Sequence, residues 1–142
     1  MKCIQAILIA LILFASACTQ QVSTEEYMEN GRSYFNERKW KSAVIEFKNV
    51  LQQSPKHSEA RALLGQTYIK TGSSNAAIKE LKRAIEFGYD KDILMRPLSK
   101  AYLQVDQLHN VVDEILPNKN QSKETQASIY AMRAIAYMGL KN

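Results

Sequence analysis

The stretch "RALLGQTYIKTGSSNAAIKELKRAI", Arg61 to Ile85, decides the fold. It shows no strand-like alternation of apolar and polar residues, and neither does the rest of the chain, which is predicted to be all-α. Gly72 can take the left-handed conformation that ends a helix, and Ser73 or Ser74 can cap the helix that follows. The stretch therefore predicts two helices joined by a tight turn.

The same pattern recurs along the chain at a fixed spacing. Tyrosines set the period, each 34 or 35 residues from the next: Tyr34, Tyr68, Tyr102 and Tyr137. A small residue lies three positions before each tyrosine: Gly31, Gly65, Ser99 and Ala134. An alanine and a large apolar residue follow the first two tyrosines at matching distances: Ala43 with Phe47, and Ala77 with Leu81. Self-similarity at this period indicates a solenoid of stacked units.

The period and the residue types resemble the tetratricopeptide repeat (TPR). The resemblance covers nearly all of the chain after its first segment, and the positions that carry it are Gly31, Tyr34, Ala43, Phe47, Pro55, Gly65, Tyr68, Gly72, Ala77, Leu81 and Tyr102. It implies an all-α, TPR-type solenoid of helical hairpins with about three and a half repeats. Glycine and alanine would allow the two helices of a unit to approach closely, and aromatic residues would fill the gap between units.

This alignment divides the chain into units. Residues 24–57 form unit 1, residues 58–91 unit 2, residues 92–122 a degenerate unit 3, and residues 123–142 the first helix of an incomplete unit 4. Ser23 and Glu26 have capping-box spacing before the first helix. Pro97 lies about five residues into the first helix of unit 3, where we expect a late start or a kink. The chain is either the N-terminal part of a longer array or an unusually short product.

The N-terminal segment has the features of a signal peptide. Lys2 supplies a positive charge, Ile4 to Phe14 is almost wholly apolar, and Ala15 and Ala17 have the spacing that a signal peptidase recognises. Residues 1–17 are therefore excluded from the fold. An apolar first helix of the domain is the weaker interpretation, because the segment has no polar face.

Small residues followed at once by Cys18 resemble the lipobox of bacterial lipoproteins, although Ala15 stands where that family prefers leucine. The resemblance implies that Cys18 becomes the first residue, carries acyl chains such as palmitate, and begins a tether over residues 18–23. Thr19 in place of aspartate implies the outer membrane of a Gram-negative bacterium, on the periplasmic side. Secretion with cleavage at the same bond is the alternative. Loss of Cys3 would leave Cys18 without an intramolecular disulfide partner.

The composition argues against several kinds of function. The net charge of +5 is mild and no basic tract is interleaved with aromatics, so no nucleic-acid partner is expected. His57 and His109 lack neighbours at ligand spacing and are predicted to be solvated surface residues. No phosphate loop, nucleophile elbow or paired carboxylates are present. We expect no catalytic residue, no metal, no cofactor and no small-molecule substrate.

A protein-binding face is the better-founded prediction. In the TPR family the first helix of each unit lines a concave surface, and by position this face holds Arg32, Phe35, Asn36, Gln66, Ile69, Lys70, Arg96, Lys100 and Leu103. Basic groups would flank an apolar ladder that suits a protein segment with apolar and acidic groups. The alternative is that Phe35, Ile69 and Leu103 are core residues between units.

A narrower resemblance involves Ala76 to Ile115. The pair Gly88-Tyr89, an acidic turn and a helix containing Pro97-Leu98 resemble early repeats of the putative PEP-CTERM system TPR-repeat lipoprotein family. This implies a non-catalytic envelope scaffold for exopolysaccharide export or PEP-CTERM/exosortase protein sorting. The alternatives are a lipoprotein that assists type IV pilus or outer-membrane protein assembly, and the interaction module of a longer envelope enzyme.

Overall fold

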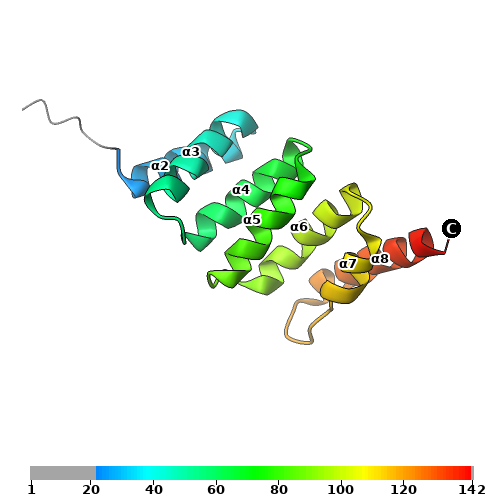
Figure 1. Cartoon of the computed structure of the whole chain (residues 1–142). Coiled ribbons are helices and arrows are strands. Elements are labelled where there is room, and N and C mark those ends of the chain that lie inside the picture. Colours follow the sequence, from blue (N-terminus) through cyan, green and yellow to red (C-terminus); the bar gives the residue numbers. More distant parts are fainter. Residues whose placement is uncertain (1–21, 142) are drawn as a thin grey trace, which may run out of the picture.

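The computed structural model describes residues 22–141, which form seven helices and no strand (Figure 1). Three hairpins and a single helix follow one another along the chain: α2 (Thr24–Asn36) with α3 (Trp40–Gln53), α4 (Ser58–Lys70) with α5 (Ser74–Glu86), α6 (Lys91–Gln104) with α7 (Leu108–Glu114), and then α8 (Lys123–Leu140). The predicted signal peptide and Cys18 lie outside the described residues. Within residues 22–141, no helix combines the length and apolar character needed to cross a membrane.

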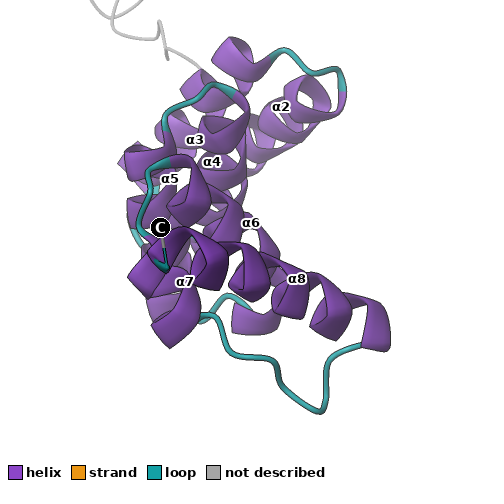
Figure 2. Cartoon of the chain, turned by 90° about the vertical axis from the view of Figure 1, so that its right-hand side faces the viewer, coloured by secondary structure: helices purple, strands orange, loops and turns teal. Residues whose placement is uncertain are grey.

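The hairpins stack in chain order into a curved array. The first helices are in contact from unit to unit, α2 with α4 and α4 with α6, and α6 in turn contacts α8. In the described part of the chain, the backbones of α3, α5 and α7 do not approach one another, although the side chains of Lys82 on α5 and Glu114 on α7 form an ion pair at 3.2 Å. Figure 2 shows the resulting bend, with α3, α5 and α7 along the outer side and the first helices along the inner side. The predicted all-α solenoid is confirmed.

Small residues allow the helices of the first two hairpins to approach closely, as predicted. A Cβ atom at Gly31 would lie 2.5 Å from the Phe47 ring. A Cβ atom at Gly65 would lie 2.7 Å from Leu81 Cγ and 3.2 Å from the carbonyl oxygen of Ala77. Real Cβ contacts are almost never this short, so glycine is what lets these helices pack.

The turn inside each hairpin uses one backbone conformation. Arg38, Gly72 and Asp106 occupy equivalent positions 34 residues apart, with φ angles of 59°, 76° and 57°. The left-handed conformation predicted for Gly72 is therefore present, and the other two turns achieve it with residues that carry a Cβ atom. Each turn is closed by a backbone bond, such as that from Ser73 N–H to Tyr68 O at 2.8 Å.

The predicted helix caps are only partly formed. Ser23 accepts a hydrogen bond from Glu26 N–H at 3.1 Å, as expected for the start of α2. Ser73 occupies the N-cap position of α5, but its side chain makes no capping bond. Ser74 instead donates to Gln104 Oε1 at 2.6 Å and so joins α5 to the end of α6. Ser74 thus links two units, and neither serine caps α5 with its side chain.

Unit 3 departs from the other two in its second helix. For its first helix we predicted a late start or a kink at Pro97. The late start is absent, since α6 begins at Lys91, with Asp90 accepting from Asp92 N–H at 2.8 Å, and Pro97 lies inside it; the kink stays a prediction. The early start is possible because the Asp90 cap holds the first turn independently of Pro97. In contrast, α7 contains only seven residues and ends at Glu114.

The apolar core runs through the stack in two clusters. The first joins α2, α3 and the start of α4: Met28, Ala43, Phe47, Val50, Ala60 and Leu64. The second extends from α4 to α8, and its largest buried side chains are Tyr102, Leu81, Leu94, Met95, Ile115 and Ile129. Tyr68 packs against both clusters. Each hairpin therefore depends on its neighbour for burial, as expected of a solenoid.

Candidate protein-binding groove

The inner side of the curve, formed by α2, α4 and α6, contains the residues predicted for partner binding. Five of them are exposed: Arg32, Asn36, Lys70, Arg96 and Lys100. Gln66, Phe35 and Leu103 are half-buried, the last two packed against the core clusters. Ile69 is only 6% exposed and belongs to the core. The structure therefore favours the core interpretation for Ile69, and the exposed part of the groove is polar and mainly basic.

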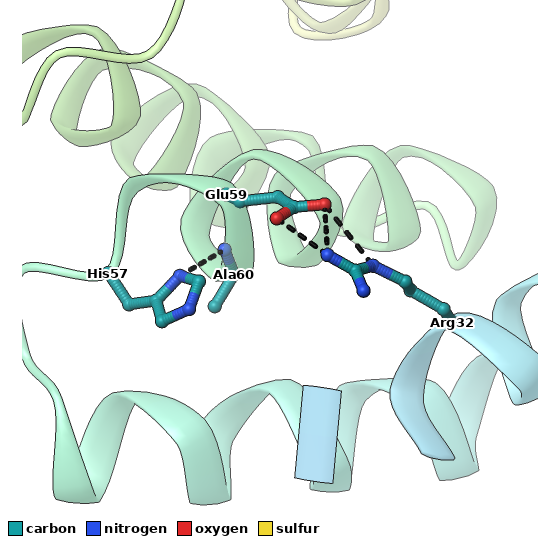
Figure 3. Close-up of polar contacts among 4 residues, drawn as sticks. All are labelled: Arg32, His57, Glu59 and Ala60. Carbon is teal, nitrogen blue, oxygen red and sulfur yellow. Dashed lines mark hydrogen bonds and ion pairs between the residues drawn. The ribbon is translucent and has the colours of Figure 1, made fainter. Parts of the chain in front are cut away.

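One of these basic groups is already paired. Arg32 on α2 holds Glu59 on α4 through both carboxylate oxygens, each 2.7 Å from Nη2, with Nε 3.2 Å from Oε1 (Figure 3). Both side chains are substantially exposed, so this ion pair contributes little stability in water. It crosses from unit 1 to unit 2 and fixes the position of the guanidinium in the groove.

His57 has a structural role that the sequence analysis missed. It is the N-cap residue of α4, and its Nδ1 accepts a hydrogen bond from Ala60 N–H at 3.3 Å (Figure 3). The predicted solvated histidine is instead half-buried at a helix start. The signal was its place directly before Ser58-Glu59, since an acceptor followed by an acidic first turn is typical of a helix N-terminus. His109 is exposed on α7.

Charge is distributed unevenly across the groove. On α2 and α4, acidic residues lie near the N-terminal end (Glu25, Glu26, Glu29 and Glu59), and basic residues lie near the C-terminal end or just beyond it (Arg38, Lys39, Lys41 and Lys70). The ends of α6 are mixed, with Lys91 and Asp92 at its start and Lys100 and Asp106 near its end. Because these helices are equivalent in successive units, like ends lie at the same edge. A ligand with its own charge asymmetry would be oriented by this field.

Two clusters of polar side chains join helices within the stack. Arg61 pairs with Glu80 and donates to the carbonyl oxygen of Pro55 at 3.0 Å from Nε. Tyr102 donates to Glu114 at 2.7 Å, which connects α6 to α7. Burial raises the pKa of Tyr102, and hydrogen bonding to Glu114 adds to this effect.

No cluster of three or more potential metal ligands is found among residues 22–141. A hollow of about 310 Å³ does lie where α7 ends, lined by Ile85, Met95, Leu98 and Leu116 together with charged side chains. It occupies the space beside the short second helix of unit 3.

Comparison with known proteins agrees with this architecture. No curated protein matches the chain. The family model of the tetratricopeptide repeat matches residues 34–102, from the last turn of α2 to the last turn of α6. Among solved structures, that of the TPR2B domain of yeast Sti1 in complex with pHsp70 is similar, with 19% sequence identity and a TM-score of 0.59 over 82% of this chain and 84% of that chain. The chain is thus an all-α solenoid with the TPR fold, and residues 34–102 have the sequence of tetratricopeptide repeats.

Proposed function

We propose that this chain is a non-catalytic scaffold that binds a segment of another protein along the inner side of α2, α4 and α6. The observation that carries the proposal is the row of exposed polar side chains, such as Asn36, Lys70 and Lys100, on the first helices of successive units. Because the apolar residues of these helices are largely packed in the core, the exposed row is available to a partner. The TPR2B domain of yeast Sti1 offers a precedent, since it has this fold and forms a complex with pHsp70.

Site-specific photo-cross-linking in cells tests the groove. A photoreactive residue placed at Asn36 or at Lys100 should yield the same cross-linked protein, identified by mass spectrometry. The matched control is Lys48, which is exposed on α3 at the outer side of the stack. The cross-links should fade when Arg96 and Lys100 are changed to glutamate, because the groove loses its basic edge. Equal products from Asn36 and Lys48 would refute the groove.

We further propose that the protein is lipid-anchored in the cell envelope of a Gram-negative bacterium, in the outer membrane and facing the periplasm. The support is the sequence Ala15-Ser16-Ala17-Cys18 behind an apolar run. One acyl chain gives only marginal membrane binding and two or more give a stable anchor, at about 0.8 kcal/mol per buried methylene. Removal of residues 1–17 would leave a tether over residues 18–23 before the helices begin.

Lipidation is expected to depend on Cys18. Cells labelled with an acyl-chain analogue should incorporate it into the wild type and not into Cys18→Ser, and the variant should leave the membrane fraction. Cys3→Ser is the matched control, because Cys3 lies in the segment that would be removed, and its labelling should match the wild type. Equal labelling and equal membrane partition of Cys18→Ser and the wild type would contradict the anchor.

The pathway that we propose is exopolysaccharide export or PEP-CTERM/exosortase protein sorting, with support from the resemblance of Ala76 to Ile115 to repeats of the corresponding lipoprotein family. Assistance to type IV pilus or outer-membrane protein assembly is the alternative that shares the anchor and the repeats. An interaction module of a longer envelope enzyme is the alternative from another class. Exopolysaccharide or exosortase genes beside this gene would support the first, pilus or porin-assembly genes the second, and a catalytic domain in the same reading frame the third.

A further inference from the structure

A second surface lies at the turn between α2 and α3, where the chain faces the end of α4. A cleft of about 470 Å³ is present there, and its lining includes Trp40 and four cations: Arg38, Lys39, Lys41 and Lys70. The cleft combines one large aromatic ring with a concentration of positive charge. None of the repeat-specific packing described above requires this combination.

The positive charge of the cleft is largely unneutralised. Lys39 pairs with Glu37, with Nζ 2.7 Å from the carboxylate oxygen. Within residues 22–141, no carboxylate lies at salt-bridge distance from Arg38, Lys41 or Lys70. Three cations therefore face solvent around one hollow, and their field attracts an anionic ligand.

Trp40 provides an apolar contact in the middle of these charges. Its ring is half-buried and meets Phe35 edge to face, with ring centroids 5.4 Å apart and planes at 73°. Lys70 Nζ lies 5.9 Å from the centre of the Trp40 ring, within the range of a cation–π contact. The contacts with Phe35 and Lys70 restrict the orientation of the indole. A fixed aromatic ring is the type of anchor that dominates the energy of protein interfaces.

Arg38 is placed in the cleft at a conformational cost. It has a φ angle of 59°, in the left-handed region, at the position where unit 2 has Gly72 with a φ angle of 76°. Glycine takes this conformation without steric penalty, whereas a residue with a Cβ atom does not. The turn of unit 1 therefore holds a cation where glycine would fit better. Strain of this kind persists where the side chain has another use.

We propose that this cleft binds an acidic segment of a partner protein. Carboxylates of the segment contact Arg38, Lys41 and Lys70, and an apolar side chain of the segment packs on Trp40. The assignment rests on the proposed function in one respect, that the partner is a protein. A protein segment is favoured over an anionic membrane because the cleft combines cations with a half-buried aromatic ring, which suits a chain that carries carboxylates and an apolar side chain together.

The test exploits the fact that Trp40 is the only tryptophan of the chain. Tryptophan emission of the full-length protein in an uncharged detergent is titrated with a short peptide of glutamate, leucine and glycine. A second peptide has glutamine in place of each glutamate. The glutamate peptide should shift the emission and bind about tenfold or more tightly than the glutamine peptide, with an affinity that falls as salt is added.

Three variants test whether binding of the peptide depends on the cleft itself, rather than on net charge or on folding. Lys41→Gln with Lys70→Gln should weaken binding of the glutamate peptide about fivefold or more. The control pair Lys48→Gln with Lys119→Gln removes the same charge from exposed positions elsewhere and should leave the affinity unchanged. Arg38→Gly should weaken binding while raising the melting temperature by a few degrees, because it relieves the left-handed strain. A folding defect would instead lower both the affinity for the peptide and the melting temperature.

Several results would overturn the assignment. Equal binding of the two peptides would refute recognition of carboxylates. Equal losses of affinity in the two double-lysine variants would show that only the net charge matters. A response of Trp40 to phosphatidylglycerol vesicles but not to the glutamate peptide would assign the cleft to lipid. In each of these cases, the cross-links in the groove of α2, α4 and α6 are an independent test. If they persist, the proposed function stands and only the binding of an acidic segment in the cleft is rejected.

Discussion

Gly65 shows how a single hydrogen atom in place of a side chain sets the distance between two helices. Gly65→Ala should lower the free energy of unfolding by about 1–3 kcal/mol, because the new methyl group meets the Leu81 side chain and the Ala77 carbonyl. Chemical denaturation measures this, and Gly65→Leu should cost more. In the double variant with Leu81→Ala, the penalty of the added methyl should shrink. A denaturation midpoint equal to that of the wild type would contradict the close approach.

Arg61 is a residue whose role the sequence analysis could not foresee. It lies in the first turn of α4, where a surface position is the default for a charged side chain, yet its side chain is only 9% exposed. Its partner Glu80 is 19 residues away, and the Pro55 carbonyl becomes available only once the turn before α4 is formed. Periodicity predicts which face of a helix is buried, but it carries no information about which polar groups meet inside.

Removing one partner of this buried pair should be more damaging than removing both. Arg61→Met should cost about 3–5 kcal/mol of unfolding free energy, because Glu80 is left buried without a counter-charge. Adding Glu80→Leu should recover most of that loss. Denaturation of the two single variants and the double variant gives the coupling between the residues. Additive losses would show that the pair does not act as a unit.

At the scale of the element, α4 and α5 were predicted more accurately than α6 and α7. The turn at Gly72 and the close approach at Gly65 and Ala77 are local features, and the residue types at these positions predict them directly. Pro97 suggested a late start or a kink, and the late start is absent because the cap at Asp90 fixes the first turn. The repeat period does not indicate the length of the second helix of unit 3, and α7 ends at Glu114. Pro117 disfavours helical conformation in the residue before it, and this local effect outweighs the repeat pattern.

The short α7 is held to the stack by Glu114. Its carboxylate accepts hydrogen bonds from Tyr102 at 2.7 Å, Asn110 at 2.9 Å and Lys82 at 3.2 Å. Burial alone would raise the pKa of Glu114, but these three donors outweigh it and the pKa is lowered from its usual value of 4.5. A carboxylate with a lowered pKa stabilises the fold above its unfolded-state value, and this contribution is lost as pH falls through the folded-state value.

Glu114→Gln should therefore destabilise the protein in a pH-dependent way. The variant keeps the shape but loses the charge, and it should cost about 1–2 kcal/mol near neutral pH. The difference from the wild type should shrink in acid, well below pH 4.5, where Glu114 itself becomes protonated. Unfolding free energies at the two pH values provide the check, with Asp113→Asn as the exposed neighbouring control. A difference that stays constant with pH would show that the charge of Glu114 is not involved.

At the scale of the whole molecule, α8 leaves one side of the stack uncovered. Tyr130, Ile135 and Met138 are 58%, 52% and 61% exposed. Between Ala127 and Met138 the only charged residue is Arg133, which is turned inward and donates to the carbonyl oxygen of Ile115 at 3.0 Å. An uncharged exposed helix face of this length favours association in water.

This chain alone should consequently self-associate, or its α8 should fray. In hydrogen exchange, amides of residues 127–138 should exchange faster in the monomer than those of residues 63–68, which lie within the core. Ile135→Gln with Met138→Gln should reduce association seen by light scattering and leave the protection of residues 63–68 unchanged. A monomeric species with equal protection in both segments would contradict this expectation.

The bend of the stack has a mechanical consequence. Successive units touch through their first helices on the inner side, whereas the backbones of α3, α5 and α7 stay apart on the outer side, where the Lys82–Glu114 ion pair joins α5 to α7. The inner contacts act as a row of pivots, and contacts such as that between α3 and α4 provide the restoring force. We expect such an array to bend more easily than it shears, since a change of curvature disturbs few contacts between the outer helices, such as the Lys82–Glu114 ion pair. Tension between its two ends would therefore be taken up first as a change in groove width, before any hairpin loses its own packing.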